Sequence, residues 1–275
     1  VPGGLLHSNI AVCTLFGAVS GSSLSTAAAV GSVAYPEMLK RGYDKEAVVG
    51  SLAGGGTLGL LIPPSLSLLI FGALTETSIG RLFVAGVIPG LLVSALFMAY
   101  IFFLCLRRPQ IAPRWKESTS VWAVLRGMVQ IWPILLLILS IMGSIMFGLA
   151  TPTEAAGVGV VVAIIISFAW GELTLAKLAA AVLRSVLLFA SIGFIVLGAA
   201  ILSQSVSILG VPQSILEMAI NSNLGTYGIF ALIILIYVLF GCIFDGLSLM
   251  IMTLPIVFPL LTGLGFDPIW IGVII

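Results

Sequence analysis

The sequence predicts an all-α polytopic membrane protein built from inverted repeats, with two re-entrant helical hairpins and a discontinuous transmembrane helix. Three observations lead to this fold class: the composition, the length of the apolar runs, and a motif that occurs twice. Of the 275 residues, 60% are hydrophobic and only 8% are charged, and the mean hydropathy is +1.29. Soluble domains carry about 25% charged residues. The apolar runs are about 20 residues long and lack strand-like alternation, which favours spanning helices over a barrel.

The first predicted hairpin comprises residues 1–19 and 24–39, which flank the polar tip Ser20-Gly21-Ser22-Ser23. Each arm is shorter than the run of about 20 apolar residues that a spanning helix needs. A bent tip leaves backbone groups without helical partners, and a membrane tolerates this only where protein or a water-filled cavity supplies partners. The pattern therefore predicts a re-entrant hairpin whose tip can bind a small cation.

The same pattern returns near the end of the chain, where residues 227–244 and 247–261 form the arms of a second predicted hairpin. Such a repeat, with a broken hydrophobic segment in each copy, indicates the binding region of a secondary transporter. The corresponding pairs are Leu15-Phe16-Gly17 with Leu239-Phe240-Gly241, the first tip with Asp245-Gly246-Leu247-Ser248, Pro36 with Pro259, and Gly42-Tyr43-Asp44 with Gly265-Phe266-Asp267.

Between the hairpins, residues 46–75 are predicted to form a discontinuous spanning helix. Four glycines weaken its centre and Pro63-Pro64 interrupt it, so an unwound stretch is expected at 59–64. Plain spanning helices are expected at 81–106, 131–149, 155–170 and 185–203. A polar, basic loop is expected at 107–130, and an amphipathic interfacial segment at 173–184.

The charge distribution supports the inverted orientation of the hairpins. If the first hairpin opens toward the cytoplasm, the five crossings between the hairpins make the second open to the opposite side. Lysine and arginine favour cytoplasmic loops. This arrangement places all 11 basic residues except Arg81 on the cytoplasmic side, and none of them occurs after Arg184.

Two polar interruptions of apolar segments are the candidate functional sites. Hydroxyls of Ser20, Ser22 and Ser23 at the first tip, with free carbonyls at 59–63, would form a neutral site made only of oxygen atoms. Hard cations prefer oxygen ligands, and unwound carbonyls coordinate sodium in transporters with broken helices. The alternative is that the serines and glycines only allow helices to pack closely.

The acidic residues are ambiguous at this stage. Asp245 is the one acid deep inside an apolar segment, and it is either an ion ligand or relay or the N-cap of the second arm. Glu154 is expected in the first turn of a helix that Thr caps. Glu37, Asp44 and Asp267 are expected to be solvated or paired at the hairpin ends. No phosphate-binding loop, nucleophile elbow or metal-ligand spacing of Cys and His is present, so the sequence predicts neither an enzyme nor ATP-driven transport.

Five segments resemble the large membrane (M) subunit of TRAP (tripartite ATP-independent periplasmic) transporters, within the ion transporter superfamily. In chain order they are GAVSGSSLSTAAAVGSVAYPEMLKRGYDKE, GTLGLLIPPSLSLLIFG, SIGRLFVAGVIPGLL, TPTEAA and FDGLSLMIMTLPIVFPLLTGLGFDPIW. The resemblance implies a Na⁺-driven symporter that imports an organic acid, such as a C4-dicarboxylate or a sugar acid, by an elevator mechanism. It also implies a small membrane (Q) subunit, a periplasmic solute-binding protein, a multi-pass location in a bacterial or archaeal inner membrane, and no nucleic acid partner.

The resemblance also implies where Na⁺ and the substrate bind. One Na⁺ site would use Ser20, Ser23, Gly59 and Pro63. The other would use Gly198, Gly241, Phe244, Asp245 and Ser248. Because no buried Arg is available to hold a carboxylate, the partially positive N-terminal ends of the second arms are the predicted substrate contacts, at Ser22, Ser23, Gly246 and Ser248.

A division into three functional parts follows from this interpretation. Residues 1–78 form the first half of a transport domain, 79–184 the spanning and interfacial helices of a scaffold, and 185–275 the second half of the transport domain. In this family, scaffold helices precede the first hairpin and a second broken helix follows the second one. Neither is seen here, which predicts a fragment with an incomplete second ion site.

Three other functions are compatible with parts of the pattern. A stand-alone sodium:carboxylate symporter would have the same architecture without a receptor. An ion channel could use the serine and glycine breaks as a filter, although filters are usually formed by several subunits around one axis. The absence of a second intramembrane acid or of a His to pair with Asp245 argues against an intramembrane enzyme.

Overall fold

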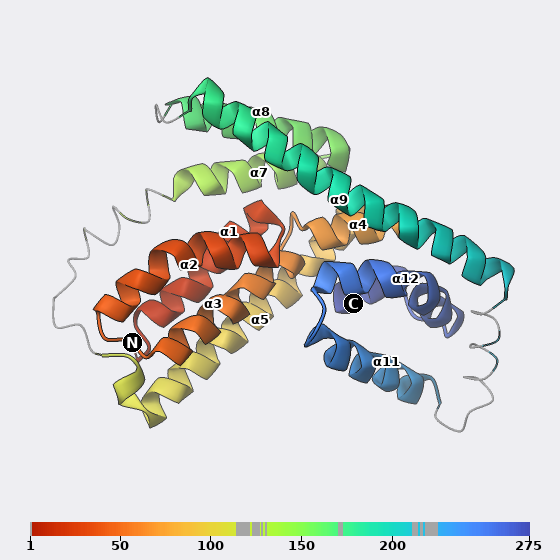
Figure 1. The fold of residues 1–275 in the computed structure, drawn as a ribbon, viewed down its shortest axis with the longest axis horizontal. Helices are drawn as coiled ribbons and strands as arrows, with labels where there is room; N and C mark the ends of the chain where they lie inside the picture. The colour runs from red at the N-terminus through yellow and green to blue at the C-terminus, as the bar shows by residue number, and fades with distance from the viewer. Residues whose placement is uncertain are drawn as a thin grey trace. The chain divides into compact units, whose positions relative to one another are not determined.

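The computed structural model describes residues 2–113, 131–169, 173–210 and 225–275, with the single positions 122, 127, 129, 214 and 217. Every regular element in these residues is helical, so the all-α prediction is confirmed for them (Figure 1). The predicted basic loop at 107–130 lies largely outside the described residues. The elements are α1 (Leu5–Ser20), α2 (Ser23–Lys40), α3 (Lys45–Leu61), α4 (Leu66–Thr75), α5 (Ile79–Arg107), the 3-10 turn η1 (Pro109–Ile111), α7 (Trp132–Met146), α8 (Pro152–Ala169), α9 (Leu175–Ile208), α11 (Gly225–Gly241), α12 (Gly246–Gly263) and α13 (Pro268–Ile274).

Five segments of the described chain are long and apolar enough to cross a membrane, which makes this a multi-pass membrane protein. They are Lys45–Thr75, Ile79–Arg107, Pro152–Ala169, Leu175–Leu202 and Gly246–Gly263. The last of these is α12, the second arm of the second predicted hairpin. Length alone would therefore let this arm span, and its re-entrant course stays a prediction.

The discontinuous helix is present, but its interruption is shorter than predicted. Helix α3 continues through Gly59 to Leu61, and α4 starts at Leu66. The stretch without helical structure is thus 62–65 rather than 59–64. Proline lacks an N–H group and disfavours helix in the residue before it, so the break begins immediately before Pro63, while the glycines are accommodated in the helix.

Helix α9 differs from the prediction of an interfacial segment followed by a separate spanning helix. It runs without interruption over 34 residues, from Leu175 to Ile208. The reason lies in its sequence, because neither glycine nor proline occurs between Leu175 and Ile192. The boundary at 184/185 in the three-part division falls within this helix, and the division itself stays a prediction.

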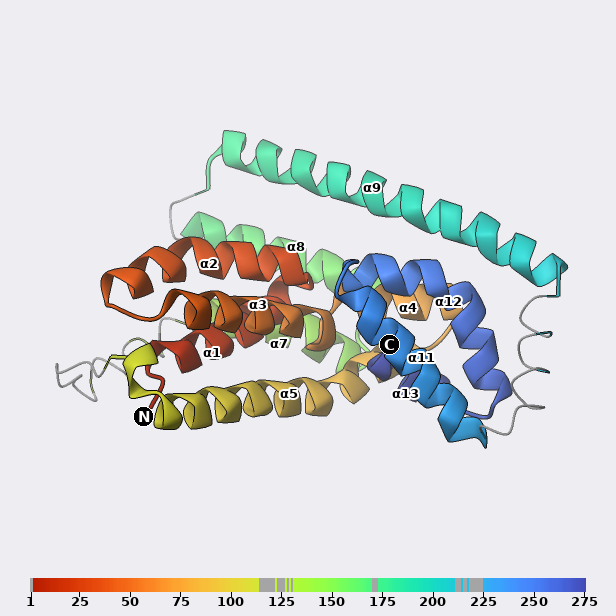
Figure 2. The ribbon, with the colours of Figure 1, turned by 60° about the horizontal axis from the view of Figure 1, so that its bottom comes forward.

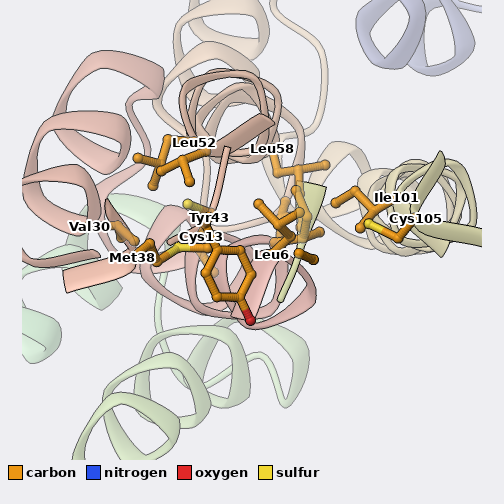
Figure 3. Packing of buried hydrophobic residues seen from close by; sticks show 14 residues of the cluster. Leu6, Cys13, Val30, Met38, Tyr43, Leu52, Leu58, Ile101 and Cys105 are labelled. Atoms are coloured by element: carbon orange, nitrogen blue, oxygen red, sulfur yellow. The ribbon is translucent and has the colours of Figure 1, made fainter. Parts of the chain in front are cut away.

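By its internal contacts the chain forms two compact units. The first contains Val1–Ile70 and Ser78–Ala169, and the second contains Phe71–Thr77 and Trp170–Ile275. In the first unit, α3 packs against α1, α2 and α5, as both ribbon views show (Figures 1 and 2). The hydrophobic core between these helices includes Leu6, Cys13, Val30, Met38, Leu52, Leu58, Ile101 and Cys105 (Figure 3).

In the second unit, α12 is the central element and contacts α9, α11 and α13. Aromatic rings join the ends of α11, α12 and α13. Phe266 and Trp270 stack with ring centroids 5.1 Å apart and an interplanar angle of 7°, and Phe230 lies 5.3 Å from Phe266 and 5.0 Å from Trp270. Such contacts add stability beyond the burial of the rings.

The second arm of the first hairpin ends in a Schellman turn. The N–H of Gly42 donates to the carbonyl of Leu39 at 3.0 Å, and the N–H of Tyr43 donates to the carbonyl of Met38 at 3.1 Å. Gly42 has a φ of 79°, a left-handed conformation that glycine adopts at little cost. Asp44 follows as the N-cap of α3 and accepts a hydrogen bond from the N–H of Ala47 at 2.9 Å.

The second arm of the second hairpin ends in the same way. Gly265, with a φ of 91°, donates to Thr262 at 3.0 Å, and Phe266 donates to Leu261 at 3.1 Å. Asp267 then caps α13 by accepting from the N–H of Ile269 at 2.8 Å. The turn and the cap that follow the second arm are therefore the same in both copies of the sequence repeat.

Candidate functional site

The first tip is a two-residue turn between α1 and α2. Gly21 ends α1 with a φ of 60° and donates its N–H to the carbonyl of Gly17 at 2.8 Å. Ser22 caps α2, and its hydroxyl accepts a hydrogen bond from the N–H of Ser25 at 3.4 Å. The predicted helix–tip–helix arrangement is thus present, and the N-terminus of α2 points its backbone donors toward the tip.

Hydroxyl groups form a closed cluster at this tip. Thr26 Oγ1 donates to the carbonyl of Ser22 at 2.7 Å, and the hydroxyls of Ser20 and Thr26 are 2.6 Å apart. Because a hydroxyl has one proton and Thr26 uses its own at Ser22, Ser20 can donate to Thr26, and its hydroxyl also lies 3.3 Å from the carbonyl of Ser22. The N–H of Ser22 donates to Ser20 Oγ at 3.4 Å, so Ser20 and Thr26 each keep a lone pair for a cation.

Glycines on α3 let the tip approach the backbone of this helix. A Cβ atom placed on Gly59 would lie 3.0 Å from Thr26 Oγ1, 3.1 Å from the carbonyl of Ser22 and 3.3 Å from the Cα of Gly17. One placed on Gly56 would lie 3.0 Å from the carbonyl of Ser23. The glycines therefore do allow close helix packing, and this packing brings oxygen atoms of the tip against α3.

The interruption between α3 and α4 lies beside the same tip. A Cβ atom on Gly21 would be 3.0 Å from the backbone N of Leu66 and 3.4 Å from the carbonyl O of Pro64. The structure thus brings together the predicted residues Ser20, Ser23, Gly59 and Pro63 around one tip. Their binding of Na⁺ stays a prediction.

The two prolines of the interruption change the hydrogen bonding of α3. In a continuous helix, the N–H groups of residues 63 and 64 would donate to the carbonyls of Gly59 and Leu60. Proline cannot donate, so neither carbonyl has this partner. Ser65 Oγ donates to the Leu60 carbonyl in its place. The Gly59 carbonyl, beside the tip, is therefore the better candidate for an external ligand.

One residue that sequence reasoning missed carries an unusual feature. Ser67 Oγ is buried and has no hydrogen-bond partner among the described residues. Buried polar atoms without partners are rare and often mark a site for water or an ion. Ser67 lies four residues after Pro63, on the first turn of α4. Its position four residues after Pro63 could have identified Ser67 from the sequence. Thr26 was also missed, and its position four residues after Ser22 could have identified it.

The second tip is built differently, although α12 matches α2 in length. Helix α11 ends at Gly241, and a four-residue connection, 242–245, leads to α12. Asp245 caps α12 by accepting from the N–H of Leu247 at 3.2 Å, which confirms the capping role. The rings of Phe240 and Phe244 lie 6.1 Å apart at this tip.

The second predicted ion site is not assembled in the same way as the first. No atom of the described residues outside their own helix turns lies within 4 Å of a Cβ placed on Gly198 or on Gly241. The residues of α9 that follow Gly198, including Ala199 and Gln204, instead line a cavity with the middle of α12, at Pro255 and Pro259. The ligand roles of Gly198, Gly241, Phe244, Asp245, Gly246 and Ser248 stay predictions.

Glu154 lies in the predicted first turn. The hydroxyl and the backbone N–H of Thr151 both donate to Glu154 Oε2 at 2.8 Å, and the N–H of Glu154 donates to Thr151 Oγ1 at 3.4 Å. This reciprocal pair is a capping box at the start of α8. Glu154 therefore has a structural role here. Glu37, in turn, pairs with Arg41 at 2.7 Å, as expected for a hairpin end.

The first site suits a hard monovalent cation. The atoms that would coordinate the cation are neutral hydroxyl and carbonyl oxygens from α1, α2 and α3. No group of three or more His, Cys, Asp or Glu side chains comes together within the described part of the chain. Soft or highly charged metals prefer sulfur, nitrogen or carboxylate ligands, so the donor set at this tip fits Na⁺ better than a transition metal.

Comparisons with known proteins identify the family of this chain. The family model for the tripartite ATP-independent periplasmic transporter, DctM component, matches residues 1–275. The chain is 36% identical over 280 residues to the ectoine/5-hydroxyectoine TRAP transporter large permease protein UehC of Ruegeria pomeroyi, and 33% identical over 275 residues to the C4-dicarboxylate TRAP transporter large permease protein DctM of Pseudomonas aeruginosa. Each match covers 100% of this chain and 64% of the relative.

A third relative, the isethionate TRAP transporter permease protein DctMQ of Oleidesulfovibrio alaskensis, is 30% identical over 278 residues. That match covers 100% of this chain and 43% of the relative. The chain therefore spans less than two thirds of the length of each of these relatives. Their names also include three chemically different solutes.

Proposed function

Because this chain belongs to the DctM-component family of tripartite ATP-independent periplasmic (TRAP) transporters, we propose that it forms the ion- and substrate-binding part of a sodium-coupled importer. The full transporter takes an organic acid from a periplasmic solute-binding protein and carries it across the bacterial inner membrane. The observation that carries this proposal is the packing of the first tip against the proline-interrupted helix, which gathers neutral oxygen ligands in an apolar protein.

Sodium at the first site would be held by the hydroxyls of Ser20 and Ser23 and by the carbonyls of Gly59 and Pro63. Thr26 joins this set because its hydroxyl is part of the tip cluster. These groups come from α1, α2 and the α3–α4 interruption. An ion bound to all of them favours the conformation in which the tip is closed onto α3, and this differential affinity is what couples an ion to a conformational change.

The substrate class follows from the helix termini at the tips. Helices α2 and α12 begin at the tips, so their N-terminal N–H groups favour an anion near Ser22, Ser23, Gly246 and Ser248. The names of the relatives include a dicarboxylate, ectoine and isethionate. We therefore propose a small organic acid and do not restrict it to dicarboxylates or sugar acids.

Transport by an elevator motion, with a small Q subunit as partner, completes the proposal. In the proposed elevator motion, residues 1–78 and 185–275 move together as the transport domain, and residues 79–184 stay in place as the scaffold. Support for the small subunit comes from family membership and from the relative named DctMQ. Chemical catalysis is not part of the function, since the related proteins are permeases.

Uptake in proteoliposomes tests the proposal. The full-length polypeptide that carries this sequence would be reconstituted with its small subunit and given labelled C4-dicarboxylate, ectoine or isethionate. Each solute would be offered with and without the receptor and with and without an inward Na⁺ gradient. We expect uptake of one solute class to require both the receptor and the inward Na⁺ gradient.

The other outcomes identify the alternatives. Sodium-driven uptake that needs no receptor would establish the stand-alone symporter. Current that flows down the ion gradient without solute uptake would establish the channel. Uptake that needs the receptor but is indifferent to Na⁺ would remove the ion from the proposal and leave the receptor-dependent transporter intact.

A further inference from the structure

A second cavity region in the first unit has no role in the transport site. It lies between the start of α3 and the end of α5, and it has two connected parts. The apolar part, about 470 Å³, is lined by Ile10, Gly50, Gly54, Phe97 and Ile101 among others. The polar part, about 510 Å³, is lined by residues 107–111 and Asp44. Asp44, Arg108 and Ile111 line both parts, so the two adjoin.

The polar part lies at the membrane boundary. Asp44 directly precedes the candidate span Lys45–Thr75, and Arg107 is the last residue of the candidate span Ile79–Arg107. The wall between them is fixed, because the N–H of Asp44 donates to the carbonyl of Ile111 at 3.0 Å. This end therefore lies where lipid headgroups begin.

The apolar part has the depth of one lipid leaflet. From Asp44 to Gly54 is ten helical residues, or about 15 Å, which is half of a hydrocarbon core of about 30 Å. At that depth the ring of Phe97 comes within 3.7 Å of a Cβ placed on Gly54 and closes the floor. Around Gly50 the space is open, since nothing lies within 4 Å of its Cβ position.

The charges at the mouth have both signs. Arg107 and Arg108 can hold a phosphate, while Asp44 and Glu46, which line the same cavities, favour a cation. A purely anionic headgroup would be repelled by the two carboxylates. A headgroup with a phosphate and a primary ammonium satisfies both sets.

We propose that this groove is a binding site for phosphatidylethanolamine, with one acyl chain along Gly50 and Gly54, the phosphate at Arg107 and Arg108, and the ammonium at Asp44 and Glu46. The site is independent of the proposed transport function. It requires only that α3 and α5 lie in a membrane.

Gly50 and Gly157 make a matched pair of variants. Both are exposed helical glycines with open space around the Cβ position, but only Gly50 lines the groove. Gly50→Leu places a side chain in the groove from an open Cβ position, and Gly157→Leu adds the same side chain to α8. Two headgroup variants complete the set: Arg108→Ala removes a phosphate contact, and Glu46→Gln removes an ammonium contact.

The experiment uses the purified, delipidated full-length protein and an equimolar mixture of phosphatidylethanolamine, phosphatidylcholine and phosphatidylglycerol with identical acyl chains. Native mass spectrometry gives the amount of each lipid bound. We expect phosphatidylethanolamine to exceed phosphatidylcholine by about two- to fivefold, the range of one exposed ion pair. Gly50→Leu should abolish this excess and Gly157→Leu should keep it. Arg108→Ala should reduce binding of all three lipids, and Glu46→Gln, which leaves Asp44 in place, should reduce the excess of phosphatidylethanolamine over phosphatidylcholine.

Two results would overturn the proposal. One is wild-type protein that binds the three lipids equally, as expected if a helix of a partner subunit or no specific ligand fills the groove. The other is Gly50→Leu protein that keeps the full excess. Elution volume and unfolding temperature show whether Gly50→Leu folds like wild type. If it does not, the test rests on Arg108→Ala and Glu46→Gln, which change only exposed side chains.

Discussion

Helices α2 and α12, the second arms of the two hairpins, each have 18 residues, an internal proline at corresponding positions and the same terminal turn. The first arms of the two hairpins, α1 and α11, differ in what surrounds their C-terminal glycines. In the first hairpin, a Cβ on Gly17 would lie 2.8 Å from the Cα of Gly59. In the second, nothing lies within 4 Å of a Cβ on Gly241, the repeat counterpart of Gly17.

Within the described residues, the repeat reproduces the turn and the cap that follow each second arm, but not the tip or its packing. Caps and turns depend on neighbours within a few residues, and these residues are repeated. Packing of a tip depends on a separate helix that must supply glycines at the right positions. Helix α3, with 17 residues, does this for the first tip through Gly56 and Gly59.

The largest effect is expected from Pro63→Ala. Alanine restores an N–H that can bond the Gly59 carbonyl, so the variant should extend α3 through the interruption and remove a ligand from the tip. Receptor-dependent uptake in proteoliposomes should fall by about tenfold or more, the equivalent of at least 1.4 kcal/mol. Pro36→Ala, which also restores a helical N–H but in the arm of the hairpin, is the control. Normal uptake by Pro63→Ala would mean that the break has no functional role.

A comparison of Gly17→Ala with Gly241→Ala tests the packing difference directly. At Gly17 the new methyl group meets the backbone of α3, which cannot move aside, so we expect a loss of about 1–3 kcal/mol in stability. Gly241→Ala should change stability by no more than about 0.5 kcal/mol. Thermal unfolding in detergent measures both. Equal losses would show that the second tip is packed as tightly as the first.

Hydroxyl variants at the first tip probe ion binding with a smaller effect. Ser23→Ala and Ser67→Ala each remove one candidate oxygen ligand and little packing volume. The Na⁺ concentration for half-maximal uptake should rise several-fold, by about 1 kcal/mol of lost affinity, while the unfolding temperature changes little. Ser25→Ala, on the exposed side of α2, is the matched control. An unchanged Na⁺ dependence in both variants would remove these hydroxyls from the site.

The smallest effect is expected from substitutions at Asp245, which distinguish helix capping from Na⁺ binding. Asparagine caps a helix about as well as aspartate, whereas alanine does not, so Asp245→Ala should cost about 1 kcal/mol of stability and Asp245→Asn much less. If the carboxylate also binds Na⁺, Asp245→Asn should still weaken the Na⁺ dependence of uptake. Wild-type Na⁺ dependence in Asp245→Asn would leave capping as the role of this residue.

Parts of the site could be predicted because they depend on residue type and spacing. Polar residues in an apolar run located the first tip, and paired prolines located the broken helix. The extent of the break was wrong by three residues at its start, since Gly59 was assigned to it and is helical. The predicted boundary between an interfacial segment and a spanning helix at 184/185 is absent, because a run of residues without glycine or proline continues α9 through the change in amphipathicity.

By itself, the sequence determined the membrane class, the repeat and the local caps and turns. Apolar run lengths and the chemistry of glycine, proline and aspartate set these within a few residues of chain. Only the tertiary structure decided that Gly59 and Gly56 bring α3 against the first tip, that Thr26 completes the hydroxyl cluster, and that Ser67 Oγ is buried without a partner. Each of these depends on contact between helices distant in sequence, and the composition of one helix does not specify the surface it meets.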